Sequence, residues 1–176
     1  MRNLIASTAA FFLLVEPVAF AQNSAPPAAA PAAAPAAAPA ASPAVINYVT
    51  PDQMAQVARD LGYRAEIRNL SDNSKMIATG MDGLNVAIYL FRCDNGTNCP
   101  SIEFETTFDK DPSFTLTLAN KWNSQTRYTK AYIDPQSGAL TFDYDFFLDS
   151  VTMPAVKNAV TFYDGQLGKF AKFFRQ

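Results

Sequence analysis

Histidine is absent from this chain of 176 residues. Its absence excludes the imidazole base of Ser-His-Asp and Cys-His hydrolases. It also excludes the histidine-containing ligand sets on which zinc and non-haem iron sites usually depend. No catalytic signature is present, so we expect a protein that is not an enzyme and has no catalytic residues, no bound metal and no cofactor.

Cysteine is scarce, and positive charge is not concentrated anywhere in the chain. The two cysteines are too few for a metal site made only of thiolates. The 14 basic residues are scattered, and 16 acidic residues give a net charge of −2. Proteins that bind nucleic acid carry a basic patch or stripe, so we expect no nucleic-acid partner.

Long apolar runs are also missing. The run from Leu4 to Val15 is shorter than the roughly 20 residues that a membrane-spanning helix needs. It follows the positively charged start Met1-Arg2-Asn3 and precedes the small-x-small sequence Ala19-Phe20-Ala21. This arrangement is typical of a secretory signal peptide, residues 1–21, cleaved between Ala21 and Gln22. We expect a periplasmic or secreted protein with no stable membrane insertion after cleavage; an uncleaved anchor is the alternative.

Residues 22–47 are rich in alanine and proline and form a low-complexity linker. Proline recurs about every fourth residue, which prevents a regular helix because each ring removes a donor and clashes with the preceding turn. We expect an extended, disordered spacer with a polyproline bias. It serves either as a tether that holds the domain away from a surface or partner, or merely as a low-complexity spacer whose length can change without effect. The prolines are Pro26, Pro27, Pro31, Pro35, Pro39 and Pro43.

Residues 48–176 are long enough for one domain with a single core. Helical and alternating apolar patterns follow one another as helix, four strands, helix, two strands and helix. The turns between strands are short, which favours antiparallel pairing. The predicted fold class is therefore α+β, an antiparallel sheet flanked by helices. The expected ranges are helices 51–61, 114–125 and 153–174 and strands 63–68, 75–79, 84–91, 101–108, 127–133 and 139–148.

Cys93 and Cys99 enclose an Asn-Gly turn at the ends of two expected neighbouring strands. An exported protein meets an oxidising compartment, so the pair predicts a disulfide. A redox-active pair is the alternative, but it usually has the spacing Cys-x-x-Cys at a helix start. We therefore expect a structural bond.

Asp143, Asp145 and Asp149 form a carboxylate cluster near the end of the chain. The first two alternate with Phe142, Tyr144 and Phe146, so they share one face of their strand. A calcium site needs oxygen ligands on a turning backbone, which a strand does not provide. We interpret the cluster as a solvated sheet face. A calcium site or an acid/base pair is the alternative, and an enzyme would depend on Asp143 and Asp145.

The segment around Trp122 combines polar and aromatic residues. Trp122 lies on the apolar stripe of its predicted helix and is assigned to the core. Asn123 and Arg127 fall near the end of that helix, where a side chain can bond the unpaired carbonyls. They act either as caps or as contacts to a partner.

Five short motifs follow one another along the domain: Leu61-Gly62-Tyr63, Cys93 to Cys99, Asn120-x-Trp122-Asn123-x-x-x-Arg127-Tyr128, Ala131-Tyr132-Ile133-Asp134 and Asp143-x-Asp145-x-x-Leu148. In these motifs the domain resembles the YbjN family of bacterial sensory transduction regulators, over roughly residues 49–174. The resemblance implies the fold of type III secretion chaperones, helices around a twisted antiparallel sheet, and it brings no enzymatic mechanism.

The last helix carries more aromatic residues than one apolar seam requires. Phe162 and Phe173 lie beside the seam, and a helix that is apolar on a second side needs a second surface to cover it. We therefore predict an exported protein-binding module, chaperone-like or adaptor-like, with an unidentified protein partner or a second copy on these residues. Packing of both rings within the monomer is the alternative explanation. A pocket for a small apolar ligand, suggested by the 14 phenylalanines and seven tyrosines, is the alternative function.

Overall fold

A computed structural model describes residues 42–174 of the chain. These residues belong to one compact unit that starts at Ala40. The predicted signal peptide, its cleavage point at Ala21 and Gln22 and most of the linker lie outside the described residues. None of the described helices is both long enough and apolar enough to cross a membrane.

A six-stranded antiparallel sheet forms the centre of the domain, in the order β2-β3-β4-β5-β7-β6. The predicted α+β class and the four strands before the middle helix are confirmed. A separate two-stranded pair, β1 with β8, was not predicted from the sequence. The strands are β1 (Val45–Ile46), β2 (Glu66–Asn69), β3 (Lys75–Met81), β4 (Leu84–Phe91), β5 (Ser101–Phe108), β6 (Lys130–Ile133), β7 (Leu140–Phe147) and β8 (Val151–Thr152).

Three helices accompany the sheet: α1 (Pro51–Asp60), α2 (Leu116–Gln125) and α3 (Met153–Phe174). Helix α1 begins with a capping box. Thr50 Oγ1 accepts from the Gln53 amide at 3.1 Å, and Gln53 Oε1 accepts from the Thr50 amide at 2.9 Å. Two of the unpaired amides at the helix start are thereby satisfied.

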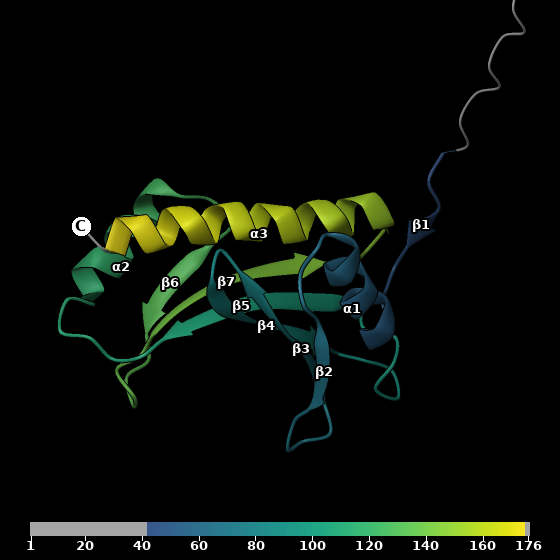
Figure 1. Cartoon of the computed structure of the whole chain (residues 1–176), viewed down its shortest axis with the longest axis horizontal. Helices are drawn as coiled ribbons and strands as arrows, with labels where there is room; N and C mark the ends of the chain where they lie inside the picture. Colours follow the sequence, from purple (N-terminus) through teal and green to yellow (C-terminus); the bar gives the residue numbers. More distant parts are fainter. Residues whose placement is uncertain (1–41, 175–176) are drawn as a thin grey trace, which may run out of the picture. The chain divides into compact units, whose positions relative to one another are not determined.

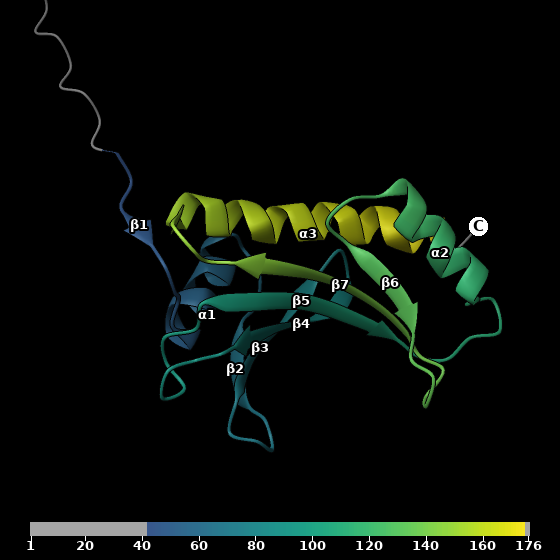
Figure 2. The ribbon, with the colours of Figure 1, turned by 180° about the vertical axis from the view of Figure 1, so that it is seen from behind.

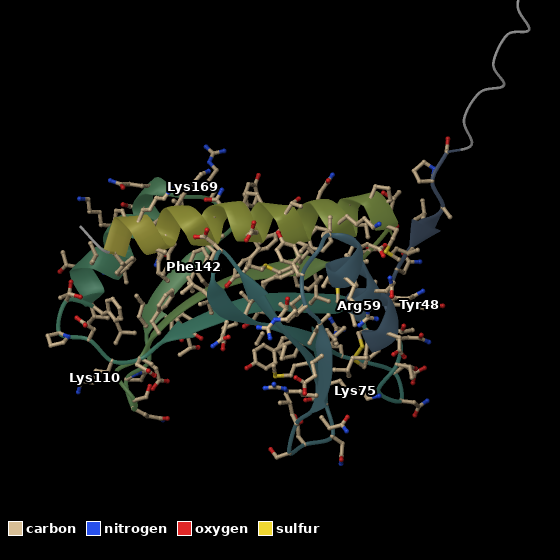
Figure 3. The ribbon with its side chains drawn as sticks, in the orientation of Figure 1. Tyr48, Arg59, Lys75, Lys110, Phe142 and Lys169 are labelled. Atoms are coloured by element: carbon tan, nitrogen blue, oxygen red, sulfur yellow. A yellow bond between two sulfur atoms is a disulfide. The ribbon has the colours of Figure 1, made fainter. Side chains whose placement is uncertain are left out.

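Helix α3 lies along one side of the sheet, with α1 near its beginning and α2 near its end (Figures 1 and 2). Its bounds agree with the prediction, and its apolar seam is buried throughout. In Figure 3, Phe142 of β7 lies between the sheet and α3, whereas Lys169 is on the outer side of α3. The seam residues are Val156, Val160, Tyr163, Leu167, Phe170 and Phe174.

Aromatic rings fill much of the space between α3 and the sheet. The Phe142 ring stacks on Phe170 with centroids 4.2 Å apart and on Tyr163 at 5.4 Å. Trp122 of α2 meets both Phe142 and Phe170 edge-on. Burying one such side chain stabilises the fold by about 2–3 kcal/mol, and aromatic pairing adds about 1 kcal/mol. Trp122 is thus a core residue, as predicted.

Three predicted elements begin two or three residues later in the structure than the sequence pattern indicates. Strand β2 starts at Glu66 rather than at residue 63. Helix α2 starts at Leu116 because Thr115 caps it, accepting from the Leu118 amide at 3.2 Å. Strand β6 starts at Lys130 because the preceding Tyr128 has a φ of 71°, which is incompatible with extended backbone.

Short backbone bridges join the segment before α1 to the rest of the domain. Strand β1 pairs with β8 through Val45↔Thr152 and Ile46↔Val151. Val49 then exchanges two backbone hydrogen bonds with Cys99, at 3.1 and 2.9 Å. The chain therefore enters the fold along a fixed path before its first helix.

Candidate functional site

The sheet has one covered face and one open face. On the strands of the sheet, side chains alternate between buried positions toward the helices and half-buried or exposed positions on the opposite face. In the part of the chain that the structure describes, α3 packs on the first face only (Figures 1 and 2). The second, which we call the open face, displays the side chains available for a function outside the core.

Strand register gathers four carboxylates at the centre of the open face. Strands β5 and β7 are neighbours, with Glu103 opposite Asp145 and Glu105 opposite Asp143. Lys130 of β6 lies opposite Asp143 on the other side. The four acidic residues, Glu103, Glu105, Asp143 and Asp145, are called the carboxylate cluster below.

Lys130 is the cation of this cluster. Its Nζ lies 3.1 Å from Asp143 Oδ2 and 3.5 Å from Asp145 Oδ2. Asp143 is only 2% exposed, whereas Asp145 and Lys130 are open to solvent. In the described residues, neither Glu103 nor Glu105 has a salt bridge; Glu105 only accepts from the Thr107 hydroxyl at 3.2 Å. The cluster thus contains two carboxylates without a cationic partner.

Burial and mutual repulsion change the ionisation of the cluster. Burial, reinforced by Asp145, Asp143 and Glu105, raises the pKa of Glu103 to about 7. Burial also raises the pKa of Asp143 to about 6, although Lys130 opposes the shift. Burial alone would lower the pKa of Lys130, but the two aspartates outweigh it and raise that pKa. The charge of the open face therefore changes near neutral pH.

A groove runs beside the cluster, with a volume of about 650 Å³. Ala78 of β3 pairs with Ala87 of β4 at its floor. The floor lies low because both side chains are single methyl groups. Glu66 flanks the floor on β2 and Glu105 flanks it on β5, since these residues continue the same row across the sheet. Tyr89 forms part of the wall. Small residues between long ones thus produce the groove.

Aromatic side chains continue the open face beyond the groove. Phe91 and Phe147 both lie opposite Ser101 in register, and they are 43% and 65% exposed. Tyr89 and Phe91 have ring centroids 6.2 Å apart. The open face therefore combines exposed apolar rings with negative charge.

The three aspartates that the sequence groups together, Asp143, Asp145 and Asp149, do not share one environment. The interpretation of a solvated sheet face is wrong for Asp143, because neighbouring strands place Glu105 and Lys130 beside it and bury it. Asp149 lies in the turn after β7, outside the cluster. The described residues contain no group of three or more carboxylate or cysteine side chains arranged to hold a metal ion.

Three important residues of the open face were missed from the sequence: Glu103, Glu105 and Tyr89. The glutamates alternate with Ile102, Phe104 and Thr106, so their shared strand face could have been read from the periodicity. Their proximity to Asp143 and Asp145 could not, because it depends on a pairing between strands that are not consecutive.

Asn123 has a structural role. Its Nδ2 donates to the Ala131 carbonyl at 2.9 Å, and its Oδ1 accepts from the Ala131 amide at 2.8 Å. The side chain thereby occupies the outer edge of β6, the last strand of the sheet. The end of α2 is capped by Thr126, whose Oγ1 donates to the Trp122 carbonyl at 2.9 Å. Arg127 is exposed and makes no hydrogen bond or salt bridge within residues 42–174, so its predicted partner contact stays a prediction.

Phe162 and Phe173 are both half-buried and have partners within the domain. The Phe162 ring lies 5.1 Å from Tyr144 and 6.1 Å from Tyr128, centroid to centroid. The Phe173 ring lies 5.5 Å from Trp122. The monomer therefore covers part of each ring, as the alternative explanation holds, and their contact with a partner protein stays a prediction.

The Cys93–Cys99 disulfide predicted from the sequence is present. It closes the loop between β4 and β5, in which Asn95 and Gly96 both have positive φ. Because Cys99 also bridges to Val49, the disulfide supports the path of the chain into α1.

Comparison with known proteins identifies a family. A family model described as "YbjN: Putative bacterial sensory transduction regulator" matches residues 50–176, which include every element of the six-stranded sheet and all three helices. No curated protein matches the chain.

Proposed function

The chain belongs to the YbjN family, and from that premise we propose that it is an exported, non-enzymatic module that binds another protein through the open face of its sheet. The proposal keeps the protein-binding role expected from the sequence and moves the main contact surface from α3 to the sheet.

The observation that carries the proposal is the exposure of Phe147 and Phe91 beside the carboxylate cluster. Aromatic rings are enriched at the centres of protein interfaces, and charged groups around them determine which partner is accepted. Both kinds of group are presented by β4, β5 and β7, the middle of the sheet. Such a rigid support holds the contacting side chains in place without loss of loop entropy on binding.

Export is supported by two features. The predicted signal peptide would direct the protein to the periplasm or the exterior, and the disulfide is stable in such compartments. The Ala/Pro-rich linker would then separate the domain from its point of attachment or release.

A small apolar ligand is a weaker candidate. The apolar side of the sheet is packed with rings from α2 and α3, including the Phe142–Phe170 stack at 4.2 Å. The groove on the open face is lined by charged residues, among them Arg64, Arg68 and Glu105. Pockets for apolar ligands have few charged groups, so the groove fits a protein better.

Site-specific photocrosslinking in the producing cells tests the proposal. A photoreactive residue at Phe147 or Thr107 would probe the open face, and one at Lys169 or Thr161 would probe the exposed side of α3. We expect one discrete crosslinked product from the open-face positions and none from the α3 positions. Mass spectrometry of that product identifies the partner.

Other crosslinking patterns would contradict the proposal. Crosslinked products from the α3 positions alone would show that the interface is on α3 rather than on the open face. A product that contains only two copies of this chain would indicate self-association. The signal peptide is checked in the same samples by N-terminal sequencing, for which we expect Gln22 as the first residue.

A further inference from the structure

We propose that the groove on the open face holds a lysine or arginine side chain of the partner protein, with its aliphatic stem over Ala78 and Ala87 and its cationic head at Glu105. This inference rests on the proposed function, whose surface it uses, and it specifies the chemistry of the partner.

The shape of the groove suits a long, thin side chain. Ala78 and Ala87 are directly paired, and Met76 and Tyr89 form the next pair along the same strands. These residues offer an apolar strip on which methylene groups can lie. Lysine and arginine bury such stems on apolar surface while the charged end stays in a polar environment.

Charge at the end of the strip favours a cation. The carboxylate cluster and Lys130 together amount to four negative charges and one positive charge, a net charge of −3 when all are ionised. Lys130 binds Asp143 and Asp145, which leaves Glu103 and Glu105 unpaired among the described residues. Glu105 borders the groove. An incoming cation would therefore meet a carboxylate that has only the Thr107 hydroxyl as a partner.

Asp143 independently indicates that the cluster has unused acceptor capacity. Its side chain is 2% exposed, and its Oδ1 has no hydrogen-bond partner in the described residues. Buried carboxylate oxygens are normally satisfied, so one that is not deserves an explanation. A second cation near Glu105 would stabilise the negative charge of Asp143 through space.

Charge also argues against a second copy of the chain as occupant. Two open faces placed against each other would bring two negatively charged clusters together, each with a net charge of −3 when fully ionised, and like charges across an interface are unfavourable. A basic segment of a different protein relieves the repulsion within the cluster instead.

The other end of the groove limits what can bind. The Arg64 guanidinium lies over Gly80, with Nη2 3.9 Å from the position that a Cβ would occupy there. Arg68 is already paired with Glu66 at 2.8 Å. Arg64 would repel a second basic group at this end, so the groove should accept one basic side chain rather than a continuous basic run.

Peptide titration of the full protein tests this inference. The probe is acetyl-Ala-Ala-Lys-Ala-Ala-amide, with matched peptides that carry arginine, acetyl-lysine or glutamate in place of lysine. Binding is followed by amide chemical shifts in NMR spectra. We expect the lysine and arginine peptides to shift Ala78, Ala87 and Glu105, and the other two peptides to leave them unchanged.

Two variants distinguish a specific site from general attraction. Glu105→Gln should weaken binding about tenfold, as expected for loss of a partly buried charge pair. Asp149→Asn removes the same charge from an exposed turn outside the cluster and should change the affinity less than about twofold. Equal effects of the two variants would overturn the inference, as would preferential binding of the glutamate peptide.

Proton release provides a further readout. Because Glu103 is partly protonated near neutral pH, an added cation should release protons when it binds, which calorimetry in buffers of different ionisation enthalpy detects. If the lysine and arginine peptides do not bind although the open face gives a crosslink, only the inference about a basic side chain is overturned. Absence of that crosslink would overturn the proposed function itself.

Discussion

Tyr163 and Thr106 are 57 residues apart in sequence, yet their hydroxyl oxygens lie 2.9 Å apart in the interior of the domain. The Tyr163 hydroxyl donates its single hydrogen to the Phe142 carbonyl at 3.0 Å, which leaves its oxygen to accept from the Thr106 hydroxyl. Helix α3 is thus joined to β5 and β7 by polar contacts at the centre of an apolar layer. A buried hydroxyl needs such partners, because burial without them is unfavourable.

Replacement of this hydroxyl should weaken the fold without changing it. We expect Tyr163→Phe to lower the free energy of unfolding by about 1–2 kcal/mol, because Thr106 loses a buried partner. Thr106→Val should have a similar effect, and the double variant should lose less than the sum. Urea denaturation measures all three. Strict additivity would show that the two hydroxyls do not interact.

Loss of the Asn123 side chain should expose the edge of β6. Asn123→Ala removes both hydrogen bonds to Ala131, so we expect a loss of about 1–2 kcal/mol and faster hydrogen exchange at the Ala131 amide. An unprotected edge strand can pair with another chain, so light scattering should also detect association. Asn158→Ala, on α3, is the control. Unchanged exchange at Ala131 would contradict the edge-protecting role.

The disulfide should stabilise the entry of the chain into α1. It spans a sequence separation of 6 residues, and closing so short a loop contributes about 2 kcal/mol in the entropy model. We expect Cys93→Ser/Cys99→Ala to lower stability by that amount and to raise hydrogen exchange at Val49. Reductant should have the same effect on the native protein and none on the variant. Equal stability of reduced and oxidised protein would refute this role.

Glu103 should make stability fall as pH rises. Its pKa in the folded state is about 7 against a reference value of 4.5, so the folded state binds more protons between those values. By linkage, the contribution of Glu103 to the free energy of unfolding is greatest below about pH 4.5. It declines as the pH rises to about 7 and is constant at higher pH.

Glu103→Gln removes this titration. We expect the variant to be more stable than the native protein at pH 8, by about 1–3 kcal/mol after allowance for solvent screening. The two proteins should converge toward pH 4.5. Denaturation curves at several pH values provide the measurement. A constant difference across the pH range would show that Glu103 is ionised normally in the folded state.

Local features of the fold were predictable because nearby residues determine them. The seam of α3 repeats at helical spacing from Val156 to Phe174, and Thr50 with Gln53 forms a capping box within four residues. Cys93 and Cys99 enclose their own turn. In each case the energetically important partners are close in sequence, so the pattern and the structure agree.

The candidate site was less predictable because it depends on distant pairing. Antiparallel hairpins explain β3 with β4 and β6 with β7, but no local signal places β5 beside β7. That placement brings Glu103 to Asp145 and buries Asp143. The role of Asn123 likewise depends on β6 being an edge strand, which only the complete sheet order determines.

The order of the elements has a consequence for the timing of folding, because α3 follows every strand of the sheet along the chain. The apolar face of the sheet stays uncovered until Tyr163, Leu167 and Phe170 are available, and these residues are synthesised after all six strands. During synthesis, the strands that precede α3 would therefore be open to chaperones. The helix thus delays maturation of the sheet until α3 itself has been made.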